Sequence, residues 1–264
     1  MAGTPRAMSD ERWPEARGRR ARAQGQRAAR FPQWIVNEAR GRGVDYGQIL
    51  VAAESHFSCL MPYQMGQVAA IYAAEVGAPP ATILDATANV GCDTIQFCRM
   101  YPAAAVTSVE IDPGIAALLR HNMARLPSVL GRRVDRPVAV LNGDGVELLL
   151  AEGHQVDLVY FDPPWGGPEY YKSPLVRLTL NGRPLGDIVG AALALGKAGL
   201  AVVKAPANAD MAEFLAAVAA RAERGAKATV TSSAHEILKP KGNRRGAVAY
   251  RLVFVRAGLR PAPA

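Results

Sequence analysis

The sequence predicts an α/β fold in which helices cover both faces of a mostly parallel sheet. Short apolar runs typical of buried strands alternate with helical segments of about ten residues through the middle of the chain. Two β-rich runs follow, and they are expected to add a terminal hairpin to the sheet. Half of the 264 residues are hydrophobic and a fifth are charged, which is the composition of a packed globular protein.

The predicted elements can be placed along the chain by their apolar spacing. Strands are expected at 81–86, 105–111, 137–142, 156–161 and 199–205, with the β-rich runs at 226–238 and 247–255. Helices are expected at 93–101, 113–126, 145–151, 186–197 and 209–223. This order resembles that of the class I, Rossmann-like methyltransferase fold, a mostly parallel sheet of seven strands with helices on both faces.

Residues 1–30 form a strongly basic arm. They hold eight arginines against three acids, a charge of +5 out of +8 for the whole chain. Such a segment is expected to be disordered and to favour polyanions, above all nucleic acid. It is also compatible with a nuclear address.

A helical extension is expected between this arm and the first strand. One helical segment is predicted at 32–56, broken near its glycines, and a second at 62–76, where Pro62 occupies the first turn. The extension is expected to contribute to the substrate site. The predicted division of the chain is a basic arm at 1–30, the extension at 31–78, the methyltransferase domain at 79–258 and a tail at 259–264.

Cysteine and histidine usage argues against two kinds of site. The three cysteines form no CxxC pair, which fits a reduced intracellular compartment, nuclear or cytoplasmic, without a disulfide framework. The four histidines are scattered without metal-ligand spacing, so no metal is expected. No apolar run is long enough to span a bilayer, so no membrane partner is expected, and no pattern indicates an oligomeric state.

Acidic residues stand at or just after the ends of the first four predicted strands. They are Asp85, Glu110, Asp144 and Asp162. In doubly wound sheets, nucleotide-type ligands bind beyond the carboxyl ends of the strands, near the point where the strand order reverses. These four ends are therefore the expected ligand site.

The stretch DATANVGCDT, residues 85–94, ends the first strand and opens the next helix. It resembles the S-adenosylmethionine-binding turn of methyltransferases and lacks the three glycines of a dinucleotide fingerprint. Glu110 is placed to accept from a ribose diol, although Asp112 is the better candidate for capping the next helix; Asp144 could accept from an adenine amino group or cap its own helix. The expected cofactor contacts are Asp85, Ala86, Thr87, Asn89, Gly91, Thr94, Glu110, Ile111, Gly143, Asp144 and Asp162.

The stretch YFDPPWGGPEYY, residues 160–171, places a rigid aromatic loop after the fourth strand. Amino-methylating enzymes commonly carry a D/N/S-P-P-aromatic motif at this position. Pro163 and Pro164 remove two backbone donors, so the carbonyls of the loop are held ready to accept from an exocyclic amine. Trp165 offers a face for stacking a base, worth about 1–3 kcal/mol, and a cationic base would stack better still. Asp162, Pro163, Pro164 and Trp165 are the predicted catalytic group.

The string DPPWGGPEY closely resembles the motif of trimethylguanosine synthases, which methylate the guanine N2 amine of a 7-methylguanosine cap. The likeness continues through DTIQFC, IDPGIAALLRHN and PANADMAEF, in the same order, from about Ser58 to Phe214. It implies capped RNA as the substrate and S-adenosylmethionine as the cofactor. The substrate contacts that the resemblance implies are Trp165, Asn122, Lys204, Pro206 and Asn208.

This chain also departs from the family pattern. Ala207 stands where the family has an arginine that would face the cap phosphates, and Lys204 is the cation nearest in sequence that could replace it. Asp162 stands where some members carry serine, so polar contact to the amine is kept with an added charge.

The function expected from these residues is methyl transfer to the N2 amine of 7-methylguanosine at an RNA 5′ cap. A second hypothesis keeps the chemistry and changes the base to adenine N6 in DNA or RNA, where a duplex target would have to be flipped out. A third is a non-catalytic module that binds caps or RNA on a decayed methyltransferase fold. Fold alone does not decide among them.

Overall fold

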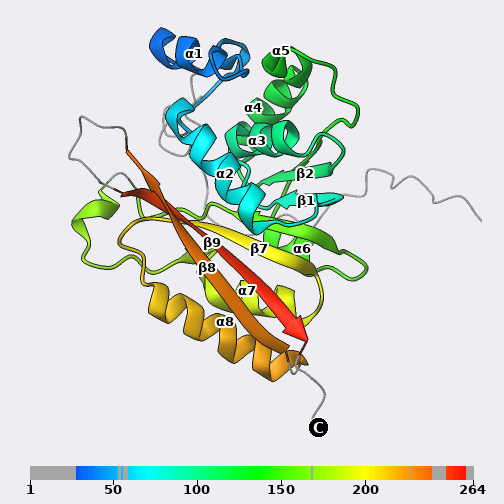
Figure 1. Ribbon diagram of the computed structural model, residues 1–264, viewed down its shortest axis with the longest axis vertical. Helices are drawn as coiled ribbons and strands as arrows, with labels where there is room; N and C mark the ends of the chain where they lie inside the picture. Colours follow the sequence, from blue (N-terminus) through cyan, green and yellow to red (C-terminus); the bar gives the residue numbers. More distant parts are fainter. Residues whose placement is uncertain are drawn as a thin grey trace, which may run out of the picture.

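A central seven-stranded sheet organises the computed structural model, which describes residues 28–52, 55, 59–167, 169–226, 228–239 and 248–259 (Figure 1). Its strands are β1 (Thr82–Asp85), β2 (Ala105–Glu110), β3 (Ala139–Asn142), β4 (Val156–Phe161), β7 (Ala198–Ala205), β8 (Ala228–Leu238) and β9 (Val248–Leu259). They lie in the order β3-β2-β1-β4-β7-β9-β8, parallel from β3 to β7, with β9 antiparallel to β7 and β8. The predicted class I, Rossmann-like methyltransferase sheet is confirmed.

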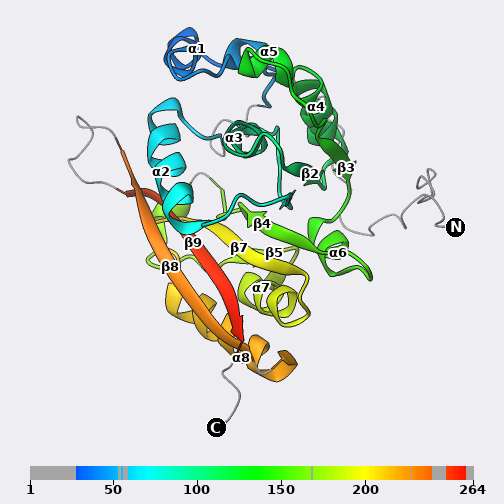
Figure 2. The same ribbon diagram turned by 45° about the vertical axis from the view of Figure 1, so that its right-hand side comes forward.

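Helices cover both faces of this sheet (Figures 1 and 2). Alternate strand residues point to opposite sides, so Ile83 joins one apolar core and Leu84 the other. The first core contains α1 to α5, and the second contains α6, α7 and α8. The helices are α1 (Gln33–Arg40), η1 (Tyr46–Gln48), η3 (Pro62–Gln64), α2 (Met65–Glu75), α3 (Cys92–Met100), α4 (Pro113–Met123), α5 (Leu126–Leu130), α6 (Gly145–Leu150), η4 (Tyr170–Lys172), α7 (Leu185–Ala194) and α8 (Met211–Ala226).

Two helical predictions are wrong in part. The segment expected as one helix at 113–126 stops at Met123, and α5 begins separately with Pro127 in its first turn. Proline disfavours helical conformation in the residue before it, but it is tolerated at a helix start, so the break falls there. The segment at 32–56 is helical only in α1 and η1, because Gly43 adopts a φ of 78° after α1 and Val51 pairs with Ala29 in an isolated β-bridge.

A short hairpin between the proline loop and α7 has no counterpart in the sequence-based expectations. It consists of β5 (Thr179–Leu180) and β6 (Arg183–Pro184), which pair in antiparallel register. Asn181 and Gly182 form its turn with φ of 52° and 76°. Asn-Gly is a strong hairpin signal because both residues tolerate positive φ. The hairpin reaches the ligand site described below.

The described part of the N-terminal extension packs directly onto the sheet domain. The Phe31 and Tyr46 rings stack with centroids 4.9 Å apart, and the Tyr46 hydroxyl donates to the Leu60 carbonyl at 2.9 Å. The Asp45 amide donates to the Val129 carbonyl at 2.7 Å. All four apolar residues belong to the same core as α3 and α4. The extension therefore shares a core with the domain.

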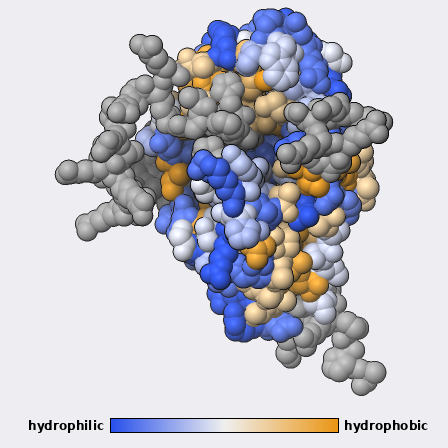
Figure 3. Space-filling model, turned by 90° about the vertical axis from the view of Figure 1, so that its left-hand side faces the viewer, coloured by the Kyte–Doolittle hydropathy of each residue, from blue (hydrophilic) through white to orange (hydrophobic). Residues whose placement is uncertain are grey.

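The edge strand β8 turns polar residues to the outside. Thr231, Ser232 and Glu236 are exposed on it, which is a usual protection of a free sheet edge. Figure 3 shows a face with hydrophilic residues interspersed among smaller apolar areas. In the part of the chain that the structure describes, no helix is both long and apolar enough to cross a membrane.

Candidate functional site

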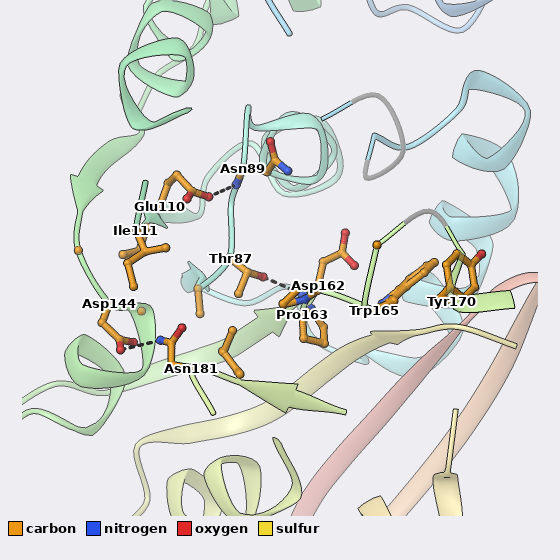
Figure 4. Close-up of a pocket in the computed structure, with 17 residues that line it drawn as sticks. Thr87, Asn89, Glu110, Ile111, Asp144, Asp162, Pro163, Trp165, Tyr170 and Asn181 are labelled. Carbon is orange, nitrogen blue, oxygen red and sulfur yellow. Dashed lines mark hydrogen bonds between the residues drawn. The ribbon is translucent and has the colours of Figure 1, made fainter. Parts of the chain in front are cut away.

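A cavity of about 590 Å³ opens at the carboxyl ends of β1, β2, β3 and β4 (Figure 4). This volume is in the range of small-molecule and cofactor sites. The predicted site residues that line it are Ala86, Thr87, Asn89, Glu110, Ile111, Gly143, Asp144, Asp162, Pro163, Pro164 and Trp165. The further lining residues, which the sequence did not single out, are Val109, Gly145, Gly167, Tyr170, Leu180 and Asn181.

The turn between β1 and α3 forms one wall of this cavity. Gly91 begins α3 with a φ of 93°, a left-handed conformation that strains any residue with a Cβ and therefore favours glycine. Asp85 and Thr94 lie behind the turn: the Thr94 hydroxyl donates to the Asp85 carboxylate at 2.6 Å, and burial raises the pKa of Asp85 to about 8. Asp85, Gly91 and Thr94 thus shape the turn without lining the cavity.

Glu110, at the end of β2, is held rigidly at the cavity wall. Its two carboxylate oxygens accept from the Asn89 amide at 3.0 Å and from the Asp112 amide at 2.8 Å. Burial is the main cause that raises the pKa of Glu110, while these backbone donors lower it. Asp112 caps α4 by accepting from Gly114 and Ile115. The two neighbouring acids therefore have separate positions, one at the cavity and one at the helix end.

Asp144 caps α6 and is also one of the residues that line the cavity. Its Oδ1 caps α6 by accepting from the Val146 amide at 2.7 Å, and its side chain also lines the cavity. Its Oδ2 accepts from the Asn181 side-chain amide at 2.7 Å. The β5–β6 hairpin thus reaches across and closes this end of the cavity, with Leu180 beside Asn181 in its lining.

The start of α6 lies so close to the backbone of the β1–α3 turn that residue 145 has to be glycine. A Cβ on Gly145 would lie 2.2 Å from the Ala86 carbonyl oxygen. Gly145→Ala is expected to destabilise the protein by about 2–4 kcal/mol, because backbone on both sides must move apart. Urea unfolding measures the effect. Gly143→Ala is the control, since a Cβ there meets nothing within 4 Å, and an equal loss in both variants would contradict the close-approach argument.

The proline loop after β4 places an acid and an aromatic ring at the other end of the cavity. The Asp162 amide donates to the Thr87 hydroxyl at 2.7 Å, which ties the loop to the β1–α3 turn. The Trp165 and Tyr170 rings make an edge contact with centroids 5.0 Å apart and an interplanar angle of 74°. Figure 4 shows Asp162 and Pro163 between this aromatic pair and the Glu110 side of the cavity.

Four of the five predicted substrate contacts do not line the cavity. Asn122 is fully buried, donates to the carbonyls of Leu50 and Val90 at 2.8 Å each and accepts from the Leu50 amide. Asn208 donates to the carbonyls of Tyr170 and Ser173. These amides join separate loops to one another. Pro206 likewise lies outside the lining, where its carbonyl accepts from the Ala209 amide.

Lys204 also lies behind the cavity wall. It is 3% exposed, and its ammonium group donates to Asp162 at 2.9 Å and to Asp93 at 3.4 Å. The charge near Ala207 comes from elsewhere: Arg251 on β9 donates to the Ala207 carbonyl at 2.8 Å and pairs with Glu236.

The acidic side chains in the lining suit a nucleoside that carries a positive charge. Three carboxylates, Glu110, Asp144 and Asp162, line the cavity, and no Lys, Arg or His does so among the described residues. Such surroundings favour a sulfonium or ammonium group, and Glu110 is a fixed acceptor of the kind that suits a ribose diol. S-adenosylmethionine has these groups, so the residues present fit it. The described residues include no group of three or more His, Cys, Asp or Glu that could hold a metal ion.

Comparison with known proteins places this architecture in a family. The family model described as RNA cap guanine-N2 methyltransferase matches residues 80–236. Trimethylguanosine synthase of Schizosaccharomyces pombe is 37% identical over 95 residues, which cover 34% of this chain and 36% of that protein. Ribosomal RNA small subunit methyltransferase J of Aeromonas salmonicida is 34% identical over 105 residues, covering 39% of this chain and 40% of that protein.

Each of these curated relatives is thus matched over well under half of its length. Among solved structures, a precorrin-6y C5,15-methyltransferase of Geobacter metallireducens has a TM-score of 0.47 and 12% identity, covering 74% of this chain and 88% of that one. The family model matches more than half of the chain. S-adenosyl-L-methionine is accordingly the cofactor, and the chain belongs to the RNA cap guanine-N2 methyltransferase family.

Proposed function

We propose that this protein transfers a methyl group from S-adenosylmethionine to the N2 amine of 7-methylguanosine at an RNA 5′ cap. The observation that carries the proposal is a single acidic cavity in which the Asp162–Trp165 loop stands next to the β1–α3 turn. A methyl donor on the turn and a base on the tryptophan would meet at Asp162. Family membership supports guanine N2 as the accepting group.

The cofactor is assigned to the wall formed by the ends of β1, β2 and β3. The backbone of Ala86, Thr87 and Asn89 would receive its amino acid portion, while Glu110 would receive its ribose diol and Asp144 its adenine amino group. Asp162, which is hydrogen-bonded to the turn at Thr87, would face the sulfonium of the cofactor. When bound, the cofactor supplies a methyl group on a sulfonium, which is a good leaving centre, so the protein mainly has to position the amine.

The base is assigned to the proline loop. Trp165 would stack the ring, and Asp162 with the carbonyls of Pro163 and Pro164 would accept from the amine and so fix its direction. A guanine methylated at N7 carries a positive charge, which the tryptophan face and the acidic lining both favour. This charge preference supports N7-methylated guanine over the unmethylated base.

The N-terminal extension is proposed to complete the substrate side. The Ser55 hydroxyl donates to the side chain of Asn89, a lining residue, at 2.6 Å, and Leu50 is tied to the β1–α3 turn through Asn122. The division at 31–78 and 79–258 stays part of this proposal. The arm at 1–30, of which residues 1–27 lie outside the described part, would add phosphate attraction that weakens with salt.

A second candidate changes the RNA and keeps the guanine amine. Lys204 is buried in ion pairs, and no cationic side chain among the described residues lines the cavity, so the lining offers cap phosphates no positive side-chain charge. A ribosomal RNA methyltransferase is among the relatives in sequence. A guanine within a structured RNA is therefore the next acceptor to test. Adenine N6 in an oligonucleotide and cofactor binding without turnover are the further alternatives.

The deciding experiment is methyl transfer from labelled S-adenosylmethionine to four acceptors side by side. They are a 7-methylguanosine cap dinucleotide, the unmethylated cap dinucleotide, small-subunit ribosomal RNA and an adenine-containing oligonucleotide without guanine. Label on the methylated cap, lost when its guanine N2 is already dimethylated, supports the proposal. Label confined to ribosomal RNA supports the second candidate, and label on the oligonucleotide means that the loop accepts adenine. Cofactor binding without any label would indicate a binding module.

A further inference from the structure

Lys204 on β7 is a buried charge for which the mechanism proposed above has no role. Its ammonium group is 2.9 Å from an Asp162 carboxylate oxygen, 3.4 Å from an Asp93 carboxylate oxygen and 5.1 Å from the centre of the Tyr250 ring. The Lys204 and Asp162 side chains are 4% and 7% exposed. Three charges thus meet behind the cavity wall, with one cation between two acids.

Stability alone gives little reason to keep such a cluster. Removing charged groups from water is costly, and well-packed apolar residues of similar volume are often no less stable than a buried ion pair. The cluster is also not remote from the site. Asp162 is the first residue of the proline loop, it is one of the residues that line the cavity, and its amide is already fixed to Thr87 at 2.7 Å.

We propose that Lys204 is a positioning residue that holds the Asp162 carboxylate in one orientation, with Asp93 as the second anchor of the ammonium group. The inference rests on the proposed function, in which Asp162 accepts from the amine to be methylated. The hydrogen bond to Thr87 fixes the backbone amide of Asp162, and the ion pair with Lys204 fixes its carboxylate. An acceptor that cannot rotate costs less to order when the amine arrives.

The titratable groups that surround Lys204 are acids and neutral phenols. Asp93 lies at the first turn of α3, and burial raises its pKa while Lys204 lowers it. Asp85 on β1 is a third buried acid whose pKa is raised to about 8. The phenols of Tyr72, Tyr160 and Tyr250, from α2, β4 and β9, have pKa values raised by burial and stay neutral. Without the ammonium group, Asp93 would lose the cation that lowers its pKa, and the Asp162 carboxylate would lose this ion pair.

The test is a double-mutant cycle on turnover. Lys204→Met is expected to lower kcat about 30-fold in the wild-type background but less than about threefold in an Asp162→Asn background, since the amide needs no counter-ion. The dissociation constant of S-adenosylhomocysteine, measured by calorimetry, should change less than about threefold.

A matched control uses the other lysine of the same β7 region. Lys197→Met removes an ammonium group that donates to the Ala151 carbonyl, away from the cavity lining, and should leave kcat unchanged. Equal loss from Lys204→Met in both backgrounds would overturn the inference. If Lys204→Met does not fold, Asp162→Asn is compared with Asp162→Asn/Lys204→Met, and a difference in kcat above about threefold overturns it.

Turnover is measured on whichever acceptor the wild-type protein labels, so a wrong acceptor changes the assay and leaves the comparison intact. If the wild type labels none of the acceptors, the proposed function fails. The cycle is then read from unfolding equilibria. A coupling of at least about tenfold between the Lys204 and Asp162 substitutions supports the pair, and additive effects overturn it.

Discussion

Trp165→Ala is expected to lower kcat on the methylated cap by more than about 100-fold while leaving cofactor affinity within about threefold. The Trp165 ring lines the cavity and contacts Tyr170 edge-on. Losing it removes a stacking contact worth about 1–3 kcal/mol and also the alignment of the amine, where a misplacement of about 1 Å can cost about 100-fold. Single-turnover kinetics, with calorimetry of S-adenosylhomocysteine binding, measures the two effects separately.

Trp34→Ala is the matched control for this prediction. Trp34 lies on α1, is 63% exposed and does not line the cavity, so its removal should leave both constants unchanged. Equal losses of turnover and cofactor affinity in Trp165→Ala would contradict the role assigned to the ring. They would mean that the tryptophan supports the cofactor wall or the fold instead.

Glu110→Ala is expected to raise the dissociation constant of S-adenosylhomocysteine about 10- to 100-fold. Hydrogen bonds to a charged group contribute about 1.5–3 kcal/mol, and Glu110 is held for them by the amides of Asn89 and Asp112. The variant also leaves the Asn89 amide without its acceptor, which loosens the β1–α3 turn. Calorimetric titration at constant ionic strength measures the change.

Asp112→Ala separates this effect from a general loss of helix stability. Asp112 caps α4 and does not line the cavity, so its removal should lower the melting temperature with little change in cofactor affinity. An unchanged dissociation constant in Glu110→Ala would contradict the ribose assignment. The acid would then serve only to hold the turn and the start of α4.

Much of the cavity could be located from the order of strands and acids. The carboxyl ends of parallel strands meet at one edge of a sheet, so Glu110, Asp144 and Asp162 had to converge once the alternation of strands and helices was recognised. The proline loop was visible for a similar local reason, since two prolines and a tryptophan define its shape within four residues. Such features need no knowledge of distant contacts.

Contacts between distant segments were not accessible in this way. Lys204 is 42 residues from Asp162 and 111 from Asp93, and only the packing of β7 beside β4 and α3 brings the three charges together. The predicted role of Lys204 at the cap phosphates depended on its nearness to Ala207 in sequence. In the structure that side chain points to the buried acids, and Arg251 is the residue that reaches Ala207.

The contact between the β5–β6 hairpin and Asp144 could not be predicted from the sequence either. Its Asn181–Gly182 turn was a readable local signal, yet its meaning depends on Asp144, which lies 37 residues away from Asn181. The sequence by itself determined the sheet, the turn after the first strand and the position of the proline loop, because periodicity, glycine and proline act over a few residues. The tertiary structure alone decided which polar groups are buried together, because burial depends on which segments pack against one another across the whole chain.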